Sequence, residues 1–178
     1  MASIQGTPGR DALPRFRERY ALVETLEVLT AEYKRHFYEA LAGEWPPLMA
    51  GAHNLLDRLE VHRIRKAIAT SSRLEYVKTV FGPHGLMDRF EFVLTADDIT
   101  HGKPHPEIYE KAVARFGLPA AEVVVIEDSV AGLRSANAAG VRCIVVPHAH
   151  TPMELIDGAY AIVPSLDDPK MWAILDIV

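Results

Sequence analysis

The stretch from Val123 to Gly132 constrains the fold of this chain more than any other. It opens with Val-Val-Val-Ile, an apolar run rich in β-branched residues that is typical of a fully buried strand. Glu127 and Asp128 follow directly, and Ser129 is a good N-cap for a helix that would end at Gly140. A buried strand, two acids and a capped helix in this order predict one β–α unit of an open α/β sheet. The acids would then lie at the carboxyl edge of the sheet, where such folds bind ligands.

The two adjacent acids have two interpretations. Neighbouring carboxylates repel each other, which favours a cation near Glu127 and Asp128. Mg²⁺ suits such a place, because proteins hold it with one or two carboxylates and leave the remaining positions to water and phosphate oxygens. Alternatively, the acids only complement the dipole of the helix that follows. This stretch alone leaves both interpretations open.

The chain after residue 47 alternates between strand and helix patterns. Short apolar runs predict strands at residues 66–69, 90–94, 143–146 and 161–163, and amphipathic spacing predicts helices at 54–60, 73–81 and 106–116. Strands that alternate with helices indicate a parallel, doubly wound α/β sheet.

The first part of the chain has a different pattern. Leu13, Phe16 and Tyr20 recur at helical spacing, and an apolar stripe over residues 22–41 predicts a second helix that Gly43 ends. No strand pattern separates the two helices, so we expect a small helical module. Trp45-Pro46-Pro47 then reads as a hinge.

Composition limits the partners that we expect. The chain has 178 residues, 49% of them hydrophobic, which suits one domain or one domain with a small appendage. A formal net charge of −5 gives no reason to expect nucleic acid or an anionic membrane as a partner. No run is apolar enough to span a bilayer, and the N-terminus lacks a secretory pattern. The lone Cys143 fits a reducing, cytoplasmic setting. The oligomeric state stays open.

Thr70-Ser71-Ser72 comes directly after the strand expected to end at residue 69. Hydroxyls and free backbone N–H groups at a helix N-terminus can bind an anion. Ser72 and Glu75 can also form a capping box for the next helix. Capping without any ligand is the simpler interpretation of this motif.

The loop Gly102-Lys103-Pro104-His105-Pro106 contains two prolines that stiffen its backbone. An ammonium held on a rigid loop is a point charge for phosphate or for nearby carboxylates. The alternative is an ordinary solvated lysine, but the prolines favour a function. We therefore expect Lys103 to serve phosphate chemistry and not stability. His148 and His150 could be a metal pair, but they lack a third ligand at suitable spacing, so we expect polar loop residues there.

These motifs together resemble a known family. Thr70-Ser71, Gly102-Lys103-Pro104 and Glu127-Asp128, followed by Gly132 and Gly140, are similar in order and interval to three of the four motifs of the haloacid dehalogenase-like (HAD) hydrolases. The β-phosphoglucomutase and phosphoglycolate-phosphatase branch, which carries a helical cap, is the most similar. The resemblance implies a partial helical cap at residues 1–46 and a doubly wound α/β core at residues 47–178.

The resemblance also implies a role for each motif. Thr70, with the amide of Ser71, would bind the transferring phosphoryl group, and Lys103 would neutralise charge around it. Glu127 and Asp128 would hold Mg²⁺, directly or through water. The implied activity is a Mg²⁺-dependent phosphatase that acts on a small phosphorylated metabolite.

The family's first motif has no counterpart in the sequence. It is an apolar strand that ends in Asp-x-Asp-Gly and supplies the nucleophile and the acid/base. Asp11 follows no strand, and Asp97-Asp98 lack the glycine. We therefore expect this strand upstream of Met1, between the strands at residues 66–69 and 123–126, and we expect the 178 residues alone to be inactive and poorly ordered.

Two other functions stay open. The first is a non-catalytic module that keeps a phosphate and metal pocket. The second is a sugar-phosphate mutase, but family mutases use an arginine in the cap loop corresponding to residues 7–10, and Gly9 stands in its place with Arg10 beside it. The cap loop therefore favours a phosphatase over a mutase.

Overall fold

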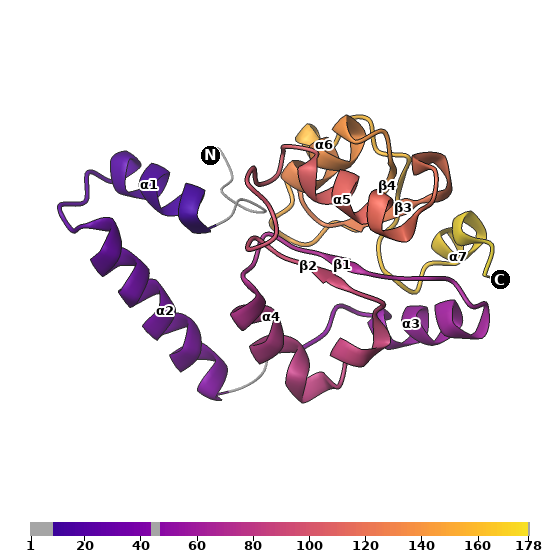
Figure 1. The fold of residues 1–178 in the computed structure, drawn as a ribbon, viewed down its shortest axis with the longest axis horizontal. Helices are drawn as coiled ribbons and strands as arrows, with labels where there is room; N and C mark the ends of the chain where they lie inside the picture. Colours follow the sequence, from indigo (N-terminus) through magenta and orange to yellow (C-terminus); the bar gives the residue numbers. More distant parts are fainter. Residues whose placement is uncertain (1–8, 44–46, 178) are drawn as a thin grey trace.

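The structure, a computed structural model, describes residues 9–43 and 47–177 (Figure 1). The helices are α1 Gly9–Arg19, α2 Leu26–Gly43, α3 Ala52–Val61, α4 Leu74–Phe81, α5 Glu107–Phe116, α6 Val130–Ala138 and α7 Pro169–Leu175. The strands are β1 Ile68–Ala69, β2 Val93–Leu94, β3 Val124–Glu127, β4 Arg142–Val145 and β5 Ala161–Ile162. None of these helices combines the length and the apolar character that crossing a membrane requires.

Every strand pair in the described residues is parallel, as the alternating pattern predicts. The strands form two groups, β1–β2 and β3–β4–β5. Val125 pairs with Cys143, and Ile144 pairs with Ala161. Among the described residues, no backbone ladder joins β1 to β3. The carboxyl ends of these two strands are where the sequence analysis places the phosphate and metal motifs.

The core has two layers that follow from the alternation of side chains along β4. Cys143 and Val145 face helices α5 and α6, where they pack with Ile108 and Leu133. Ile144 points to the opposite face and packs against side chains of α3 and α7. Helices therefore cover both faces of the sheet, which confirms the doubly wound α/β class (Figure 1).

The β3–α6 unit forms as predicted, except that β3 runs from Val124 to Glu127 and so lies one residue later than the predicted strand at 123–126. Ser129 is the N-cap of α6, and its Oγ accepts a hydrogen bond from the Gly132 N–H at 3.0 Å. Gly140 has a φ of 70°, the left-handed conformation that favours glycine after a helix. Glu127 is the last residue of the strand and pairs with Val145, so its backbone is fixed by the sheet.

The predicted capping box at α4 is wrong. The N-cap is Arg73, and the Leu74 N–H donates instead to Oδ2 of Asp97 at 3.0 Å. Glu75 turns toward helix α2 and accepts a 2.7 Å hydrogen bond from the Tyr38 hydroxyl. Helix α7 was not predicted, although Asp168 caps it and Pro169 occupies its first turn.

Helices α1 and α2 lie to one side of the α/β part (Figure 1). Leu41 is the one buried side chain among those described in these two helices. Phe37 of α2 contacts Tyr76 of α4 with ring centroids 4.8 Å apart. The two expected helices are therefore present, and Trp45 and Pro46 of the expected hinge Trp45-Pro46-Pro47 fall outside the described residues.

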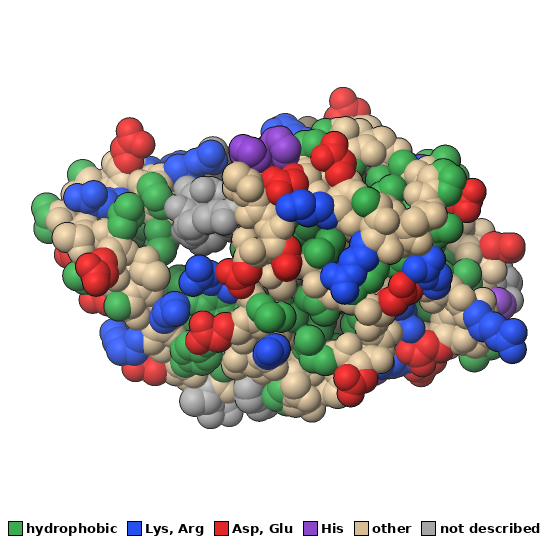
Figure 2. Space-filling view, viewed as in Figure 1, with side chains coloured by type: hydrophobic (Ala, Val, Ile, Leu, Met, Phe, Trp, Pro, Cys, Tyr) green, Lys and Arg blue, Asp and Glu red, His purple; other side chains and the backbone are tan. Residues whose placement is uncertain are grey.

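Charges of both signs are mixed over the face shown in Figure 2. No broad region of a single charge is seen in that view. Among the described residues, Arg89 pairs with Asp57 and Glu60 at 2.6 and 2.8 Å.

Candidate phosphate and metal site

Lys103 connects the carboxyl ends of the two strand groups. Its Nζ donates to the carbonyl of Ala69, the last residue of β1, at 3.1 Å. It also donates to Oε1 of Glu127, the last residue of β3, at 2.5 Å. The side chain is only 5% exposed, so Lys103 is a buried lysine and not the ordinary solvated one of the alternative interpretation. One ammonium thus spans two strands that share no backbone pairing in the described residues.

The Glu127 carboxylate is held from several sides. The Tyr109 hydroxyl donates to Oε1 and the Ser129 hydroxyl donates to Oε2, the latter at 3.0 Å. Burial pushes the pKa of Glu127 upward, but the Lys103 charge and these hydrogen bonds outweigh it and hold the pKa below its ordinary value. Glu127 is therefore an ionised carboxylate with both oxygens already accepting protein donors.

Gly132 makes room for this carboxylate. A Cβ at position 132 would lie 1.9 Å from the carboxyl carbon of Glu127 and 2.0 and 2.2 Å from its oxygens. No side chain can occupy that space, so a glycine is required for close approach and not for backbone freedom.

Asp128 has a different environment from its neighbour. Its side chain is 55% exposed, and Nε2 of the His148 imidazole lies 3.9 Å from Oδ2. Partial burial and the charge of Glu127 raise the pKa of Asp128 above its ordinary value. A cation beside Asp128 would remove this repulsion, so Asp128 is the acid of the pair that has both the access and the electrostatic need for a metal ion.

Thr70 and Ser71 follow β1 on the same side as the Lys103 ammonium. The Thr70 N–H donates to the Leu94 carbonyl at 2.9 Å, which continues the β1–β2 ladder. The Thr70 Oγ1 accepts from the Ser72 N–H at 3.1 Å. A hydroxyl that accepts this bond keeps its own proton for an anionic oxygen. Thr70 also lines a pocket of about 160 Å³ between β1, α2 and α4.

Tyr109 is the site residue that sequence reasoning missed. It lies on the buried face of α5 and is 4% exposed, and its ring centroid is 4.9 Å from the Lys103 Nζ. A tyrosine on the apolar face of a predicted helix needs a polar partner for its hydroxyl, which is a signal that the sequence offers. Tyr109 places that hydroxyl on Glu127 and its ring beside Lys103.

The other acids named from the sequence have structural roles. Asp97 caps α4, and Asp98 accepts from the N–H and the hydroxyl of Thr95, both at 2.8 Å. Asp11 lies in α1, and the residues before Gly9 fall outside the described part of the chain. His148 and His150 lie in the loop after β4, where the His150 N–H donates to Nδ1 of His148. The Asp97 carboxylate is therefore committed to the start of α4, and that of Asp98 to a local turn.

Comparisons with known proteins show which family this chain is similar to. The family described as "Haloacid dehalogenase-like hydrolase" matches residues 1–146. The protein CbbY of Rhodobacter capsulatus is 29% identical over 98% of this chain and 79% of its own length. A phosphorylated carbohydrates phosphatase of Thermotoga maritima is also 29% identical, over 94% of this chain and 70% of its own length.

A solved structure shows the same fold. The crystal structure of a CbbY variant from Rhodobacter sphaeroides, in complex with xylulose-1,5-bisphosphate, has a TM-score of 0.79 and 26% identity, over 92% of this chain and 75% of that one. Three further relatives are longer, and the chain spans 59%, 38% and 51% of them. The match over most of the sequence, in a fold shared with CbbY, establishes that this chain belongs to the haloacid dehalogenase-like hydrolase family.

Proposed function

We propose that the site formed by Thr70, Ser71, Lys103, Glu127 and Asp128 serves Mg²⁺-dependent hydrolysis of a small phosphorylated metabolite. The observation that carries the proposal is the buried ammonium of Lys103, which touches the ends of both β1 and β3. The buried ammonium lies between a loop that carries hydroxyls and a pair of acids. A phosphoryl group there could accept hydrogen bonds from the loop on one side and contact a metal ion held by the acids on the other. The phosphatase of phosphorylated carbohydrates among the relatives supports this substrate class.

Each residue would have a distinct task. Thr70 would donate its hydroxyl proton to a phosphoryl oxygen, because its Oγ1 already accepts from the backbone. The amide of Ser71 would donate beside it. Lys103 would balance the negative charge that gathers at the strand ends, while its bond to Glu127 fixes its position. Binding and orientation are thus divided between hydroxyl, amide and ammonium.

The acid pair fits Mg²⁺, but the two acids would act differently. Asp128 would be the direct ligand because it is half exposed and repelled by its neighbour. Glu127 would act through water, because Lys103, Tyr109 and Ser129 already occupy its oxygens. When bound, Mg²⁺ would neutralise charge that develops on the phosphoryl oxygens.

The phosphoryl acceptor is a separate part of the proposal. The Asp97 carboxylate accepts from the Leu74 N–H and that of Asp98 from Thr95, and no described carboxylate other than those of Glu127 and Asp128 stands at the carboxyl end of β1 or β3. We propose that an aspartate on a strand between β1 and β3 accepts the phosphoryl group, and that the 178 residues alone bind ligand without turnover.

We also propose a cap at residues 1–46, a core at 47–178 and a cytoplasmic location.

The test separates binding from turnover. Calorimetry of Mg²⁺ with the 178-residue chain should give saturable binding that Asp128→Ala weakens at least tenfold, with the exposed Asp157→Ala as a matched control. Hydrolysis of p-nitrophenyl phosphate should stay at background. Mg²⁺-dependent turnover by these residues would overturn the assignment of the acceptor, and unchanged affinity in Asp128→Ala would overturn the metal role.

A further inference from the structure

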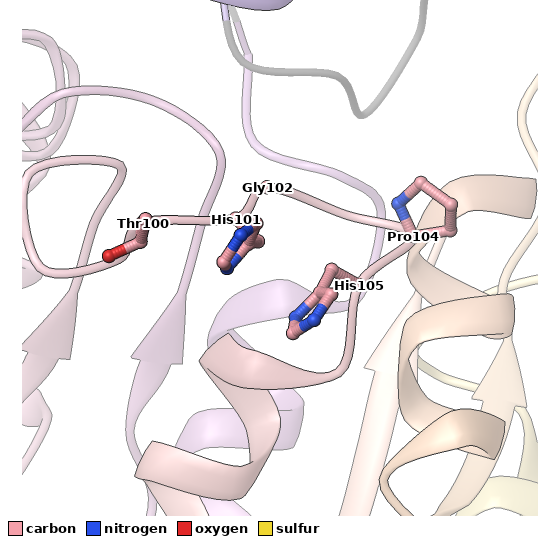
Figure 3. Close-up of a pocket in the computed structure, with 5 residues that line it drawn as sticks. All are labelled: Thr100, His101, Gly102, Pro104 and His105. Carbon is pink, nitrogen blue, oxygen red and sulfur yellow. The ribbon is translucent and has the colours of Figure 1, made fainter.

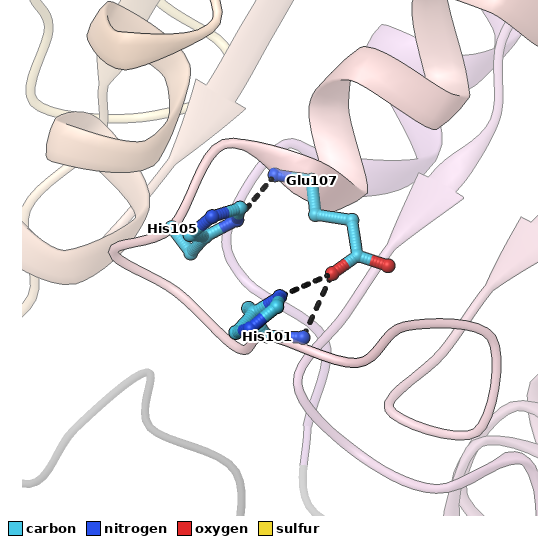
Figure 4. Close-up of side chains that lie close together, drawn as sticks. All are labelled: His101, His105 and Glu107. Atoms are coloured by element: carbon cyan, nitrogen blue, oxygen red, sulfur yellow. Dashed lines mark hydrogen bonds and ion pairs between the residues drawn. The ribbon is translucent and has the colours of Figure 1, made fainter.

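His101, His105 and Glu107 gather on the outer side of the loop that carries Lys103, and the proposed phosphatase site uses none of them. Nδ1 of His101 lies 3.2 Å from Oε2 of Glu107. The two imidazole rings stack with centroids 4.5 Å apart. One ligand atom from each of the three residues lies within 4.8 Å of the others (Figure 4). Both rings point the same way from the loop (Figure 3).

The backbone fixes this cluster. The Glu107 carboxylate accepts from the Thr100 N–H at 3.0 Å and the His101 N–H at 2.8 Å, which closes the loop onto the first turn of α5. The His105 carbonyl accepts from the buried Ser135 hydroxyl at 2.7 Å. The three side chains are therefore brought together by contacts that involve no ion, and little ordering would remain to be done on binding.

Ions can reach the cluster. His101 and His105 line an open surface depression of about 490 Å³ together with Thr100, Gly102 and Pro104 (Figure 3). The His101 side chain is 63% exposed. An ion would enter from solvent without disturbing the buried Lys103.

We propose that His101, His105 and Glu107 form a second metal site, for a borderline divalent ion such as Zn²⁺ and not for Mg²⁺. Two imidazoles and one carboxylate are the ligand types that suit Zn²⁺, Ni²⁺ and Cu²⁺, whereas Mg²⁺ prefers oxygen ligands alone. The 3.2 Å separation of His101 Nδ1 and Glu107 Oε2 matches two ligands that each lie roughly 2.1 Å from one zinc ion.

Binding requires two local changes. The ion takes the place of the contact between Nδ1 of His101 and Oε2 of Glu107, since imidazole binds metal through an unprotonated nitrogen. The His105 ring turns about its Cβ–Cγ bond to complete the site. That rotation gives up the long 3.2 Å hydrogen bond that its Nδ1 accepts from the Glu107 N–H and alters the stacking of the two imidazole rings.

The positive charge of Lys111 disfavours a metal ion at Glu107, so removing it should increase the affinity for Zn²⁺. Its Nζ donates to Oε1 of Glu107 at 2.7 Å. Removing this cation takes away a competing positive charge and leaves the Thr100 N–H as the remaining donor to Oε1. Lys111→Met should therefore bind Zn²⁺ severalfold more tightly than the native chain.

The experiment is a Zn²⁺ titration of the 178-residue chain at pH 7.5 by calorimetry, together with ¹H–¹⁵N spectra of the imidazole rings. The ring signals of His101 and His105 should shift together at one equivalent, and a large excess of Mg²⁺ should leave the isotherm unchanged. His105→Ala should weaken Zn²⁺ at least tenfold, whereas the exposed His62→Ala, matched in residue type, should leave the affinity unchanged.

Three results would overturn the proposal. The first is a shift of His148 and His150 in place of His101 and His105, which would put the ion beside Asp128. The second is competition by Mg²⁺ for the same equivalent. The third is equal affinity in His105→Ala and the native chain. The imidazole signals are measured on the unmodified chain, so the test does not depend on whether a variant folds. The Zn²⁺ titration is also independent of the phosphatase proposal.

Discussion

The β3–β4–β5 group and the β1–β2 pair each carry one half of the site, and they differ in the length of their strand pairing and in the burial of their strands. Strands β3 and β4 pair over four residues, and helices cover both of their faces. Cys143, Ile144 and Val145 in β4 are each 0% exposed. In contrast, β1 and β2 pair over two residues, and both residues of β1 are only half-buried.

This difference shows why Lys103 matters structurally. The acids Glu127 and Asp128 stand at the end of the four-residue ladder, whereas Thr70 and Ser71 follow the two-residue pair, in which Leu94 of β2 packs in the same core cluster as Val125. The ammonium of Lys103 hydrogen-bonds to the carboxyl ends of both β1 and β3. The expectation that Lys103 serves chemistry and not stability conflicts with this geometry, because a buried charge pair depends on both partners.

Lys103→Met should have the largest effect on stability. It leaves Glu127 buried without its cation, and breaking one partner of a buried pair costs about 3–5 kcal/mol. Urea unfolding measures the loss. The double variant Lys103→Met/Glu127→Gln should recover part of it, because the orphaned charge is gone. If Lys103→Met unfolds at the same urea concentration as the native chain, the Lys103–Glu127 pair does not stabilise the fold.

Ile144→Ala tests the packed strand group against the β1–β2 pair. Ile144 is fully buried, so truncation should destabilise the chain by about 2–5 kcal/mol. Ile68→Ala, the same change at a half-buried position of β1, should cost clearly less. Equal losses in denaturant unfolding would contradict the contrast between the two groups.

Tyr109→Phe should cost about 1.5–3 kcal/mol, the range for a hydrogen bond to a charged group. The ring and its packing remain, so the loss reports on the hydroxyl that holds Glu127. Tyr160→Phe is the matched control, because that ring is 53% exposed. Tyr109→Phe should have a lower melting temperature than Tyr160→Phe. Equal melting temperatures would show that the Tyr109 hydroxyl does not contribute to stability.

Cys143 reports on the packed group without any substitution. Burial, and then the charge of Glu127, raise the pKa of this thiol to about 12. The reactive thiolate is therefore almost absent below that pH, so Cys143 should resist a disulfide reagent at pH 8 and react fully in denaturant. Rapid labelling of the folded chain would show that β4 is not packed as described.

Sequence patterns predicted the β3–α6 unit because its signals are local. Three valines specify the strand, and Ser129 caps a helix that starts one residue later. The strand at residues 66–69 was predicted longer than β1, since strand length also depends on which neighbours are available for pairing.

The contacts that define the site were beyond local patterns. Lys103 and Glu127 are 24 residues apart. The carboxylate that accepts from the first N–H of α4 belongs to Asp97, 23 residues beyond Leu74. A capping box can be predicted from spacing, but a competing acid from another loop appears only in the folded chain. The sequence thus indicated which residues would gather, and the fold decided that Glu127 is occupied and Asp128 is accessible.

The most direct test of the account is whether the two halves bind ligand as one site. The measurement is a Mg²⁺ titration of the 178-residue chain in inorganic phosphate, followed by backbone amide spectra. The account predicts that the amides of Ser71 and Asp128 shift along a single binding curve, and that Lys103→Met separates the two responses. A shift at Asp128 with no response at Ser71, or two unrelated curves in the native chain, would contradict a single site spanning β1 and β3.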